Sequence, residues 1–152
     1  MRKPVFVYVS YIASTPEKVF KALTDAKATE RYWFGNGVRS DWKAGSPLTF
    51  SRAGKTIVSG TVLECDPPRR LAYTFHPEHD GLEGETPSRV AFDIEEINGQ
   101  VKLTMTHEGF EETSRVFPRI QAGWPSALSS LKSLMETGKE LPPFWTGDDA
   151  RK

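Results

Sequence analysis

A series of strand-like segments, followed by one amphipathic helix, restricts the fold of this chain more than any other feature. Segments 88–97 and 100–108 alternate apolar and polar residues and are joined by Asn98-Gly99, a dipeptide typical of a tight β-hairpin turn. Earlier segments with strand character lie at 47–52, 55–65 and 70–76. Strands that follow one another through short turns pair antiparallel, so we expect one antiparallel sheet.

The helix that follows these strands carries one apolar stripe. It starts at about Thr113 and ends before Gly138, a residue typical of helix C-termini. Its stripe repeats at intervals of four, three and four residues, at Trp124, Leu128, Leu131 and Met135. A sheet with one apolar face buries that face under such a helix, which predicts an α+β fold.

The N-terminal part adds a strand and two short helices. Residues 5–12 are rich in β-branched and aromatic side chains, as strands are. A hydroxyl cap followed by Pro16 predicts a helix over 16–24, and a second helix is expected over 27–33. In the strand at 55–65, Gly60 is the expected place of a bulge where the sheet bends. We therefore expect a curved sheet of about six to seven strands, two short helices after the first strand, and a long C-terminal helix.

Length and composition limit the class of protein. A chain of 152 residues fits one domain, which we place at 1–140, with an irregular tail at 141–152. Lys and Arg together number 20, as do Asp and Glu, which argues against nucleic-acid binding through a basic excess. No apolar run reaches the ~20 residues of a membrane span, so no membrane insertion is expected. The single cysteine, Cys65, excludes an internal disulfide and favours a cytoplasmic location. No dimer-forming stripe is evident, which predicts a monomer.

Strand alternation assigns the side chains that lie between sheet and helix. The inward set is Leu48, Phe50, Tyr73, Phe75, Phe92, Met105 and His107 from the strands, with Trp124, Leu128, Leu131 and Met135 from the helix. Such a set is compatible with an ordinary packed core. It is also compatible with a pocket, because Tyr73, His107 and Trp124 carry polar atoms that need partners inside an apolar envelope.

His107 is the polar residue best placed for chemistry. It shares the apolar strand face with Met105. One interpretation is a core histidine whose ring nitrogens are satisfied by backbone groups or water; another is a hydrogen-bond donor to a ligand carbonyl or phenol. An acid–base role would need a second group, for which Glu64 and Arg52 are candidates that spacing does not secure.

Other chemistry-bearing residues form no convincing site. Segment 76–80 (HPEHD) contains two histidines and two carboxylates, but Pro77 interrupts the strand and a polar loop follows, so we predict an exposed loop and no metal. No Cys-His-Asn pattern surrounds Cys65, which is expected to be an unreactive thiol. No glycine-rich phosphate loop precedes a helix, and neither catalytic residues nor a cofactor are predicted.

Four segments carry a family resemblance. Residues 12–25 (IASTPEKVFKALTD) are followed by Arg31-Tyr32-Trp33; residues 60–71 (GTVLECDPPRRL) fit G-x-V-x-E-x-x-P-P-x-x-L; residues 103–110 (LTMTHEGF) fit L-T-x-x-H-x-G-F. The fourth segment is Gly123-Trp124 with Leu128 and Leu131. In this order, from about Val5 to Met135, the chain resembles the activator-of-Hsp90-ATPase-like branch of the START-like superfamily, also called SRPBCC.

The resemblance implies a helix-grip fold with a cavity between sheet and C-terminal helix, and the binding of a lipid-, polyketide- or flavonoid-like small molecule there. It also leaves open a polyketide cyclase-like enzyme and a co-chaperone-type interaction module, the enzyme being less favoured. The aromatic residues that end the second helix either line the mouth of the cavity or simply pack. The expected ligand-binding residues are Trp33, Phe50, Tyr73, Phe75, Phe92, Met105, His107, Trp124, Leu128 and Leu131.

Overall fold

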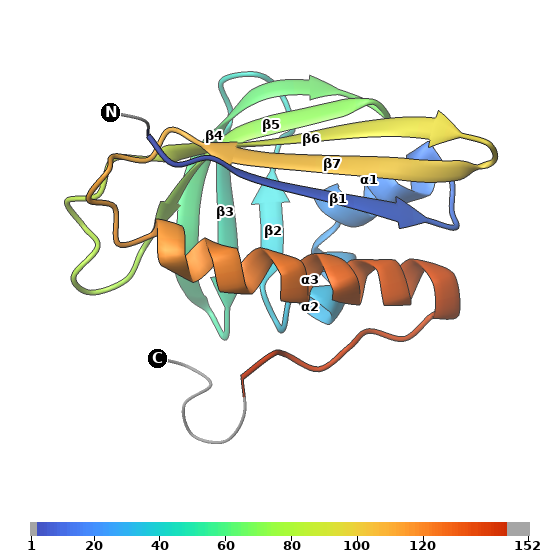
Figure 1. Ribbon diagram of the computed structural model, residues 1–152. Coiled ribbons are helices and arrows are strands. Elements are labelled where there is room, and N and C mark those ends of the chain that lie inside the picture. Colours follow the sequence, from blue (N-terminus) through green and yellow to red (C-terminus); the bar gives the residue numbers. More distant parts are fainter. Residues whose placement is uncertain (1–2, 146–152) are drawn as a thin grey trace.

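The computed structural model describes residues 3–145 as one curved sheet closed by a long helix (Figure 1). The elements in chain order are β1 (Phe6–Ile12), α1 (Pro16–Thr24), α2 (Ala26–Tyr32), β2 (Gly37–Ser40), β3 (Pro47–Arg52), β4 (Lys55–Asp66), β5 (Arg70–Pro77), β6 (Ser88–Ile97), β7 (Gln100–Glu108) and α3 (Phe117–Thr137). The predicted α+β fold is confirmed. The remainder of the predicted irregular tail, 146–152, lies outside the described residues.

All seven strands belong to one antiparallel sheet. Their order is β1-β7-β6-β5-β4-β3-β2, so every strand from β2 to β7 lies beside its sequence neighbour, and β1 closes against β7. The sheet curves around α3, which lies along its concave side (Figure 1). This is the helix-over-sheet layering that the sequence predicts. The short helices α1 and α2 contact each other, and α2 also contacts β2 and α3.

The predicted hairpin between β6 and β7 forms at the expected place. Asn98 and Gly99 have φ values of 53° and 78°, the positive pair that a type I′ turn requires. The resulting register pairs Phe92 with Met105 and Val90 with His107. Since this register puts His107 on the concave side, the turn sequence fixes where the histidine lies.

Helix boundaries follow local hydrogen bonds. The side chain of Thr15 accepts a hydrogen bond from the N–H of Lys18 and caps α1 at the predicted position. The second helix begins one residue earlier than predicted, because the Asp25 carboxylate caps it. The long helix begins at Phe117 and not at Thr113: Ser114 accepts a hydrogen bond from the N–H of Phe117 and holds the preceding residues in a turn.

The bulge predicted at Gly60 is wrong in position. Gly60 pairs regularly with Leu48, and the register shifts lie on either side of it, at Ile57 and Leu63. What Gly60 provides is space: a Cβ there would lie 1.8 Å from the carbonyl oxygen of Thr74 on β5. The absence of a side chain therefore lets the backbones of β4 and β5 approach closely at this position.

The concave side of the sheet and the inner face of α3 form one hydrophobic core. Each predicted inward residue is buried except Met135, which is half-buried and packs against this core. Met105 on β7 and Leu131 on α3 contribute to this core from the sheet and from the helix, and both are fully buried. Among residues 3–145, no helix combines the length and apolar character needed to cross a bilayer.

Candidate ligand-binding site

His107 lies at the centre of a buried chain of hydrogen bonds. The indole N–H of Trp124 donates to Nδ1 of His107 across 2.9 Å, and Nε2 of His107 lies 2.7 Å from Oγ of Ser88. The Ser88 hydroxyl in turn donates to the carbonyl oxygen of Phe75 across 3.2 Å. Because Nδ1 accepts from the indole, the ring is neutral and carries its proton on Nε2, which donates to Ser88.

This network removes His107 from acid–base chemistry. Burial lowers the pKa of His107 from its ordinary value of 6.5 to about 3. The side chain is fully buried and both ring nitrogens have protein partners. Of the interpretations that the sequence leaves open, the internally satisfied core histidine is the one the structure supports, with side-chain partners rather than backbone or water.

Sequence reasoning missed Ser88 as the partner of His107. Its signal was present in the alternation of β6, where Ser88 shares the inward face with Val90 and Phe92. The register then pairs Ser88 with Phe75 and places it next to the Val90–His107 pair. A small hydroxyl at the end of an otherwise apolar strand face is the kind of group that satisfies a buried imidazole.

Most of the predicted ligand-binding aromatics pack against one another. The ring of Trp33 lies 4.6 Å from both Phe50 and Trp124, and the Trp124 ring lies 5.9 Å from Phe92. Tyr73 is fully buried, and burial raises its pKa well above the ordinary value, so the phenol is neutral. These contacts build a continuous aromatic layer beneath α3.

A pocket of about 430 Å³ opens at one end of this layer, and we name it the inner pocket. It lies where the β3–β4 hairpin and the end of β5 meet the first half of α3 and the exit of α2. Trp33, Phe75 and Trp124 are the predicted residues that line it. The other predicted residues lie in the core and are not part of its wall: Phe50, Tyr73, Phe92, Met105, His107, Leu128 and Leu131.

The rest of the inner pocket wall was missed by sequence reasoning, apart from Phe34, one of the aromatic residues that end the second helix and were considered for the cavity mouth. Its further apolar residues are Phe34, Ile57, Val58, Leu82, Val116, Ile120, Phe144 and Trp145. Gly123 also lines it, and a Cβ at Gly123 would meet no atom within 4 Å. Helical periodicity could reveal Ile120 and Gly123 as neighbours of Trp124 on one helix face. Only the folded chain brings Phe144 and Trp145, which follow α3, to the same pocket.

Charged side chains surround the mouth of the inner pocket. Arg52, Lys55 and Arg119 supply positive charge, and Glu78 and Asp80 supply negative charge. Glu78 accepts hydrogen bonds from Ser59 and His76, which hold the pKa of its carboxyl below its ordinary value. An apolar floor with a few charged groups at the rim suits an amphipathic small molecule.

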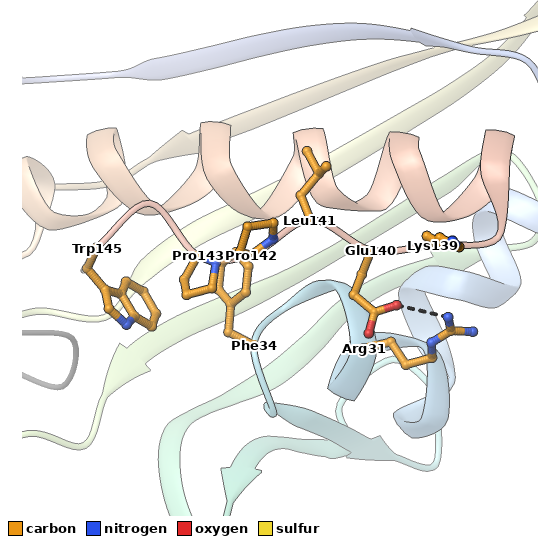
Figure 2. A pocket seen from close by; sticks show the side chains of 8 residues that line it. All are labelled: Arg31, Phe34, Lys139, Glu140, Leu141, Pro142, Pro143 and Trp145. Atoms are coloured by element: carbon orange, nitrogen blue, oxygen red, sulfur yellow. Dashed lines mark hydrogen bonds and ion pairs between the residues drawn. The ribbon is translucent and has the colours of Figure 1, made fainter. Parts of the chain in front are cut away.

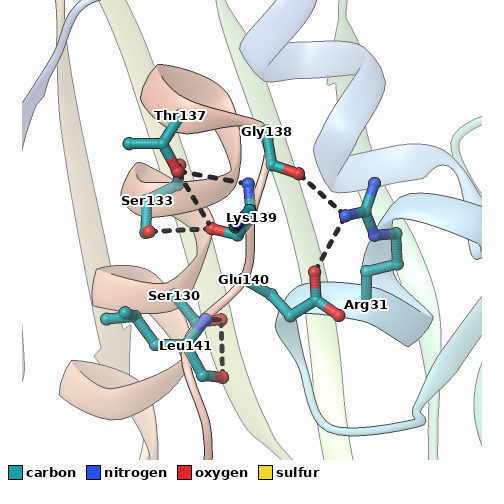
Figure 3. A network of polar contacts seen from close by, with 8 residues as sticks. All are labelled: Arg31, Ser130, Ser133, Thr137, Gly138, Lys139, Glu140 and Leu141. Carbon is teal, nitrogen blue, oxygen red and sulfur yellow. Dashed lines mark hydrogen bonds and ion pairs between the residues drawn. The ribbon is translucent and has the colours of Figure 1, made fainter.

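The C-terminal segment Lys139–Trp145, which we name the strap, forms part of the pocket wall. It runs back along α3 toward the start of that helix (Figure 2). Ser130 accepts a hydrogen bond from the N–H of Leu141 (3.0 Å) and donates one to its carbonyl oxygen (3.3 Å), while Ser133 donates to the carbonyl of Lys139 (2.7 Å). The irregular tail is thus attached to α3 at defined points (Figure 3).

The strap also binds α2 and encloses a second pocket. Nη2 of Arg31 donates to the carbonyl of Gly138 and to the Glu140 carboxylate, each across 2.9 Å (Figure 3). Between the strap and the end of α2 lies an open pocket of about 540 Å³, the outer pocket (Figure 2). Phe34 and Trp145 line both the outer and the inner pocket.

The remaining candidate residues from the sequence, His76, His79 and Cys65, have local interactions of their own. Within the described residues, no group of three or more His, Cys, Asp or Glu side chains is arranged to hold a metal ion. His76 pairs with Glu78, and Nδ1 of His79 contacts the backbone oxygen of Asp80. Burial, with a smaller effect of Asp66, raises the pKa of the half-buried Cys65 thiol and disfavours its nucleophilic thiolate form.

A seven-stranded antiparallel sheet wrapped around one C-terminal helix, with two short helices after the first strand, defines the helix-grip class of START-like proteins. Within this class, the chain belongs to the family described as "Activator of Hsp90 ATPase homolog 1-like protein", whose model matches residues 13–136. The predicted family is therefore confirmed. The strap lies beyond the matched residues.

Solved structures share this fold. The Aha1 dimer from Colwellia psychrerythraea is 23% identical with a TM-score of 0.73, covering 90% of this chain and 98% of its own. The protein MLL2253 from Mesorhizobium loti is 25% identical with a TM-score of 0.73, covering 86% and 96%. CalU16 from Micromonospora echinospora is 25% identical with a TM-score of 0.69, covering 88% and 77%. No curated protein sequence matches this chain.

Proposed function

We propose that this protein binds a hydrophobic small molecule in the inner pocket. The observation that carries the proposal is a pocket of about 430 Å³ whose floor is formed by Trp33, Phe75 and Trp124. Pockets that hold small ligands are of this size and are lined mainly by apolar and aromatic side chains. The family assignment supports the same function, because the resemblance to START-like proteins implies the binding of a hydrophobic small molecule between sheet and helix.

The core beneath the inner pocket supports a preformed site. The Trp124 indole is fixed by its hydrogen bond to His107, and Trp33 is fixed by ring contacts with Phe50 and Trp124. Side chains held in this way lose little further conformational freedom when a ligand arrives. Arg52, Lys55 and Arg119 at the mouth favour a ligand with a polar or anionic end.

Gly123→Leu is the sharpest test of this proposal. A side chain at position 123 extends into open space in the pocket wall, so leucine fills the site without a clash at its Cβ. Leucine also favours a helix over glycine by roughly 0.8 kcal/mol, so stability is expected to be kept. We expect the affinity for fatty acids, sterols or flavonoids to fall at least about tenfold. The measurement is a ligand titration followed through the NMR signals of the Trp33 and Trp124 indoles.

Gln121→Leu is the matched control for this variant. It adds the same side chain two residues away, on the exposed face of α3. Binding by this control should equal that of the unaltered protein. If none of the ligands in the panel shifts the Trp33 and Trp124 signals of the unaltered protein, the proposed function is rejected.

The two alternative functions receive different support. A cyclase that uses His107 as an acid or base is disfavoured, because both ring nitrogens are occupied and the ring is buried. A co-chaperone-type interaction is favoured by the family description and by an exposed apolar row formed by Val7, Val9 and Tyr11 on β1, with Val5 just before this strand. Stimulation of Hsp90 ATPase activity that Val7→Ser/Val9→Ser abolishes would support it; no stimulation by the unaltered protein would reject it.

A further inference from the structure

We propose that Phe34 and Trp145 form a partition that sets the length of ligand the protein accepts, and that displacement of Trp145 joins the two pockets into one groove for a long-chain carboxylate. This inference rests on the proposed function, since it concerns ligands of the inner pocket. It adds a specificity-determining residue that lies outside the part of the chain matched by the family model, 13–136.

The two pockets share these aromatic side chains. The ring centroids of Phe34 and Trp145 lie 5.3 Å apart in an edge-to-face arrangement. Both residues line the inner pocket of about 430 Å³ and the outer pocket of about 540 Å³. A side chain that belongs to the walls of two neighbouring pockets stands between them, so the Phe34–Trp145 pair separates the two spaces.

Phe34 is the fixed half of this partition. It has a φ of 55° and is followed by Gly35 with a φ of 93°, which closes α2 in a left-handed turn. The N–H of Gly35 donates to the carbonyl of Glu30 across 2.8 Å and holds this turn in place. A phenylalanine in the left-handed region is uncommon, and the surrounding structure must hold it there.

Trp145 is the half of the partition that the strap contributes. The hydrogen bonds of Ser130 and Ser133 fix the strap at Leu141 and Lys139, several residues before Trp145. After Leu141 the chain passes through Pro142 and Pro143, which restrict its direction, to the aromatic pair Phe144 and Trp145. A substitution at Trp145 therefore leaves the hydrogen bonds that anchor the strap to Ser130 and Ser133 in place.

The lining of the joined groove specifies the class of ligand. The inner pocket offers an aromatic and aliphatic floor, while the outer pocket adds Arg31, Lys139 and Glu140 beside Leu141 and the two prolines. Two cations against one carboxylate at the outer end favour a negatively charged head group. An elongated molecule with an apolar chain and a carboxylate fits this distribution, with its chain in the inner pocket.

The test measures affinity for unbranched fatty acids from octanoate to hexadecanoate in the full-length protein and in Trp145→Ala. In the unaltered protein, affinity should stop rising once the chain fills the inner pocket. In Trp145→Ala, the affinity ratio of hexadecanoate to octanoate should increase at least about tenfold, the gain expected from burying about two more methylene groups. Trp145→Phe keeps a ring against Phe34 and should retain the original ratio.

The possible outcomes separate this inference from the proposed function. If both proteins bind fatty acids with the same dependence on chain length, the partition is disproved and the binding function stands. If the unaltered protein binds no fatty acid and its Trp33 and Trp124 signals respond to no other ligand, both proposals are overturned. Tyr11→Ala removes an exposed aromatic ring on β1 that lines neither pocket, and it controls for non-specific binding.

Discussion

The indole Nε1 of Trp124 donates a hydrogen bond to Nδ1 of His107 across 2.9 Å and thereby links the middle of α3 to β7. The same indole lines the inner pocket. One residue thus belongs to the polar centre of the core and to the wall of the candidate site. Because its N–H has a partner in the core, the tryptophan offers a ligand its ring face and not its donor.

Ser88→Ala should destabilise the protein by about 1–3 kcal/mol. The substitution removes the acceptor of the His107 Nε2 proton and leaves a buried donor without a partner. The measurement is the free energy of unfolding in urea at neutral pH. Ser129→Ala is the control: its hydroxyl contacts Tyr8 in a partly exposed position, and its loss should change stability by less than about 0.5 kcal/mol. Equal effects of the two substitutions would contradict the buried network.

Stability should decrease as the pH is lowered from about 6.5 toward 4.5. Burial holds the pKa of His107 at about 3 in the folded protein, whereas in the unfolded chain the His107 pKa is near its ordinary value of 6.5. In this window the unfolded state alone takes up the proton, so unfolding is favoured by about 1.4 kcal/mol for each pH unit. Above pH 6.5 the contribution is complete and constant.

His107→Gln isolates this effect. Glutamine retains hydrogen-bonding groups but does not titrate, so the part of the pH dependence that His107 causes should vanish. Urea denaturation of both proteins at several pH values between about 4.5 and 7.5 gives the comparison. The same slope in both proteins would show that another group is responsible.

Gly60→Ala should cost about 3 kcal/mol or more. A methyl group at this position would lie 1.8 Å from the Thr74 carbonyl oxygen, so β4 and β5 would have to separate. Thermal or urea denaturation measures the loss. Gly84→Ala is the matched control, because its Cβ meets nothing within 4 Å, and it should be neutral or slightly stabilising. A well-tolerated alanine at position 60 would disprove the close approach of the two strands.

Ser130→Ala should loosen the strap without affecting the core. The Ser130 hydroxyl bonds to both the N–H and the carbonyl of Leu141, and the substitution removes both bonds. We expect amide hydrogen exchange at Leu141 to become roughly fivefold to tenfold faster, the effect of losing about 1 kcal/mol of local stability. Ser133→Ala removes only the bond to Lys139 and should leave exchange at Leu141 slower than in Ser130→Ala.

Local signals in the sequence determined the elements and their faces. The Asn98-Gly99 turn set the β6–β7 register, strand alternation placed Phe92, Met105 and His107 inward, and helical spacing gave the inner face of α3. These features depend on side-chain period and turn geometry, which operate between residues close in the chain. These local signals predicted the fold, whereas the family was predicted from the motifs that carry the resemblance.

Only the tertiary structure decided which of the inward residues border open space. Seven of the ten predicted ligand-binding residues lie in the packed core, and Trp33, Phe75 and Trp124 line the inner pocket. That division depends on where the β3–β4 hairpin and the end of β5 meet α3, and on the strap bringing Phe144 and Trp145 to the start of α3. Alternation reports the face on which a side chain lies, whereas a cavity depends on the distances between elements far apart in sequence. The sequence determined the helix over the sheet, and the packing between them located the pocket.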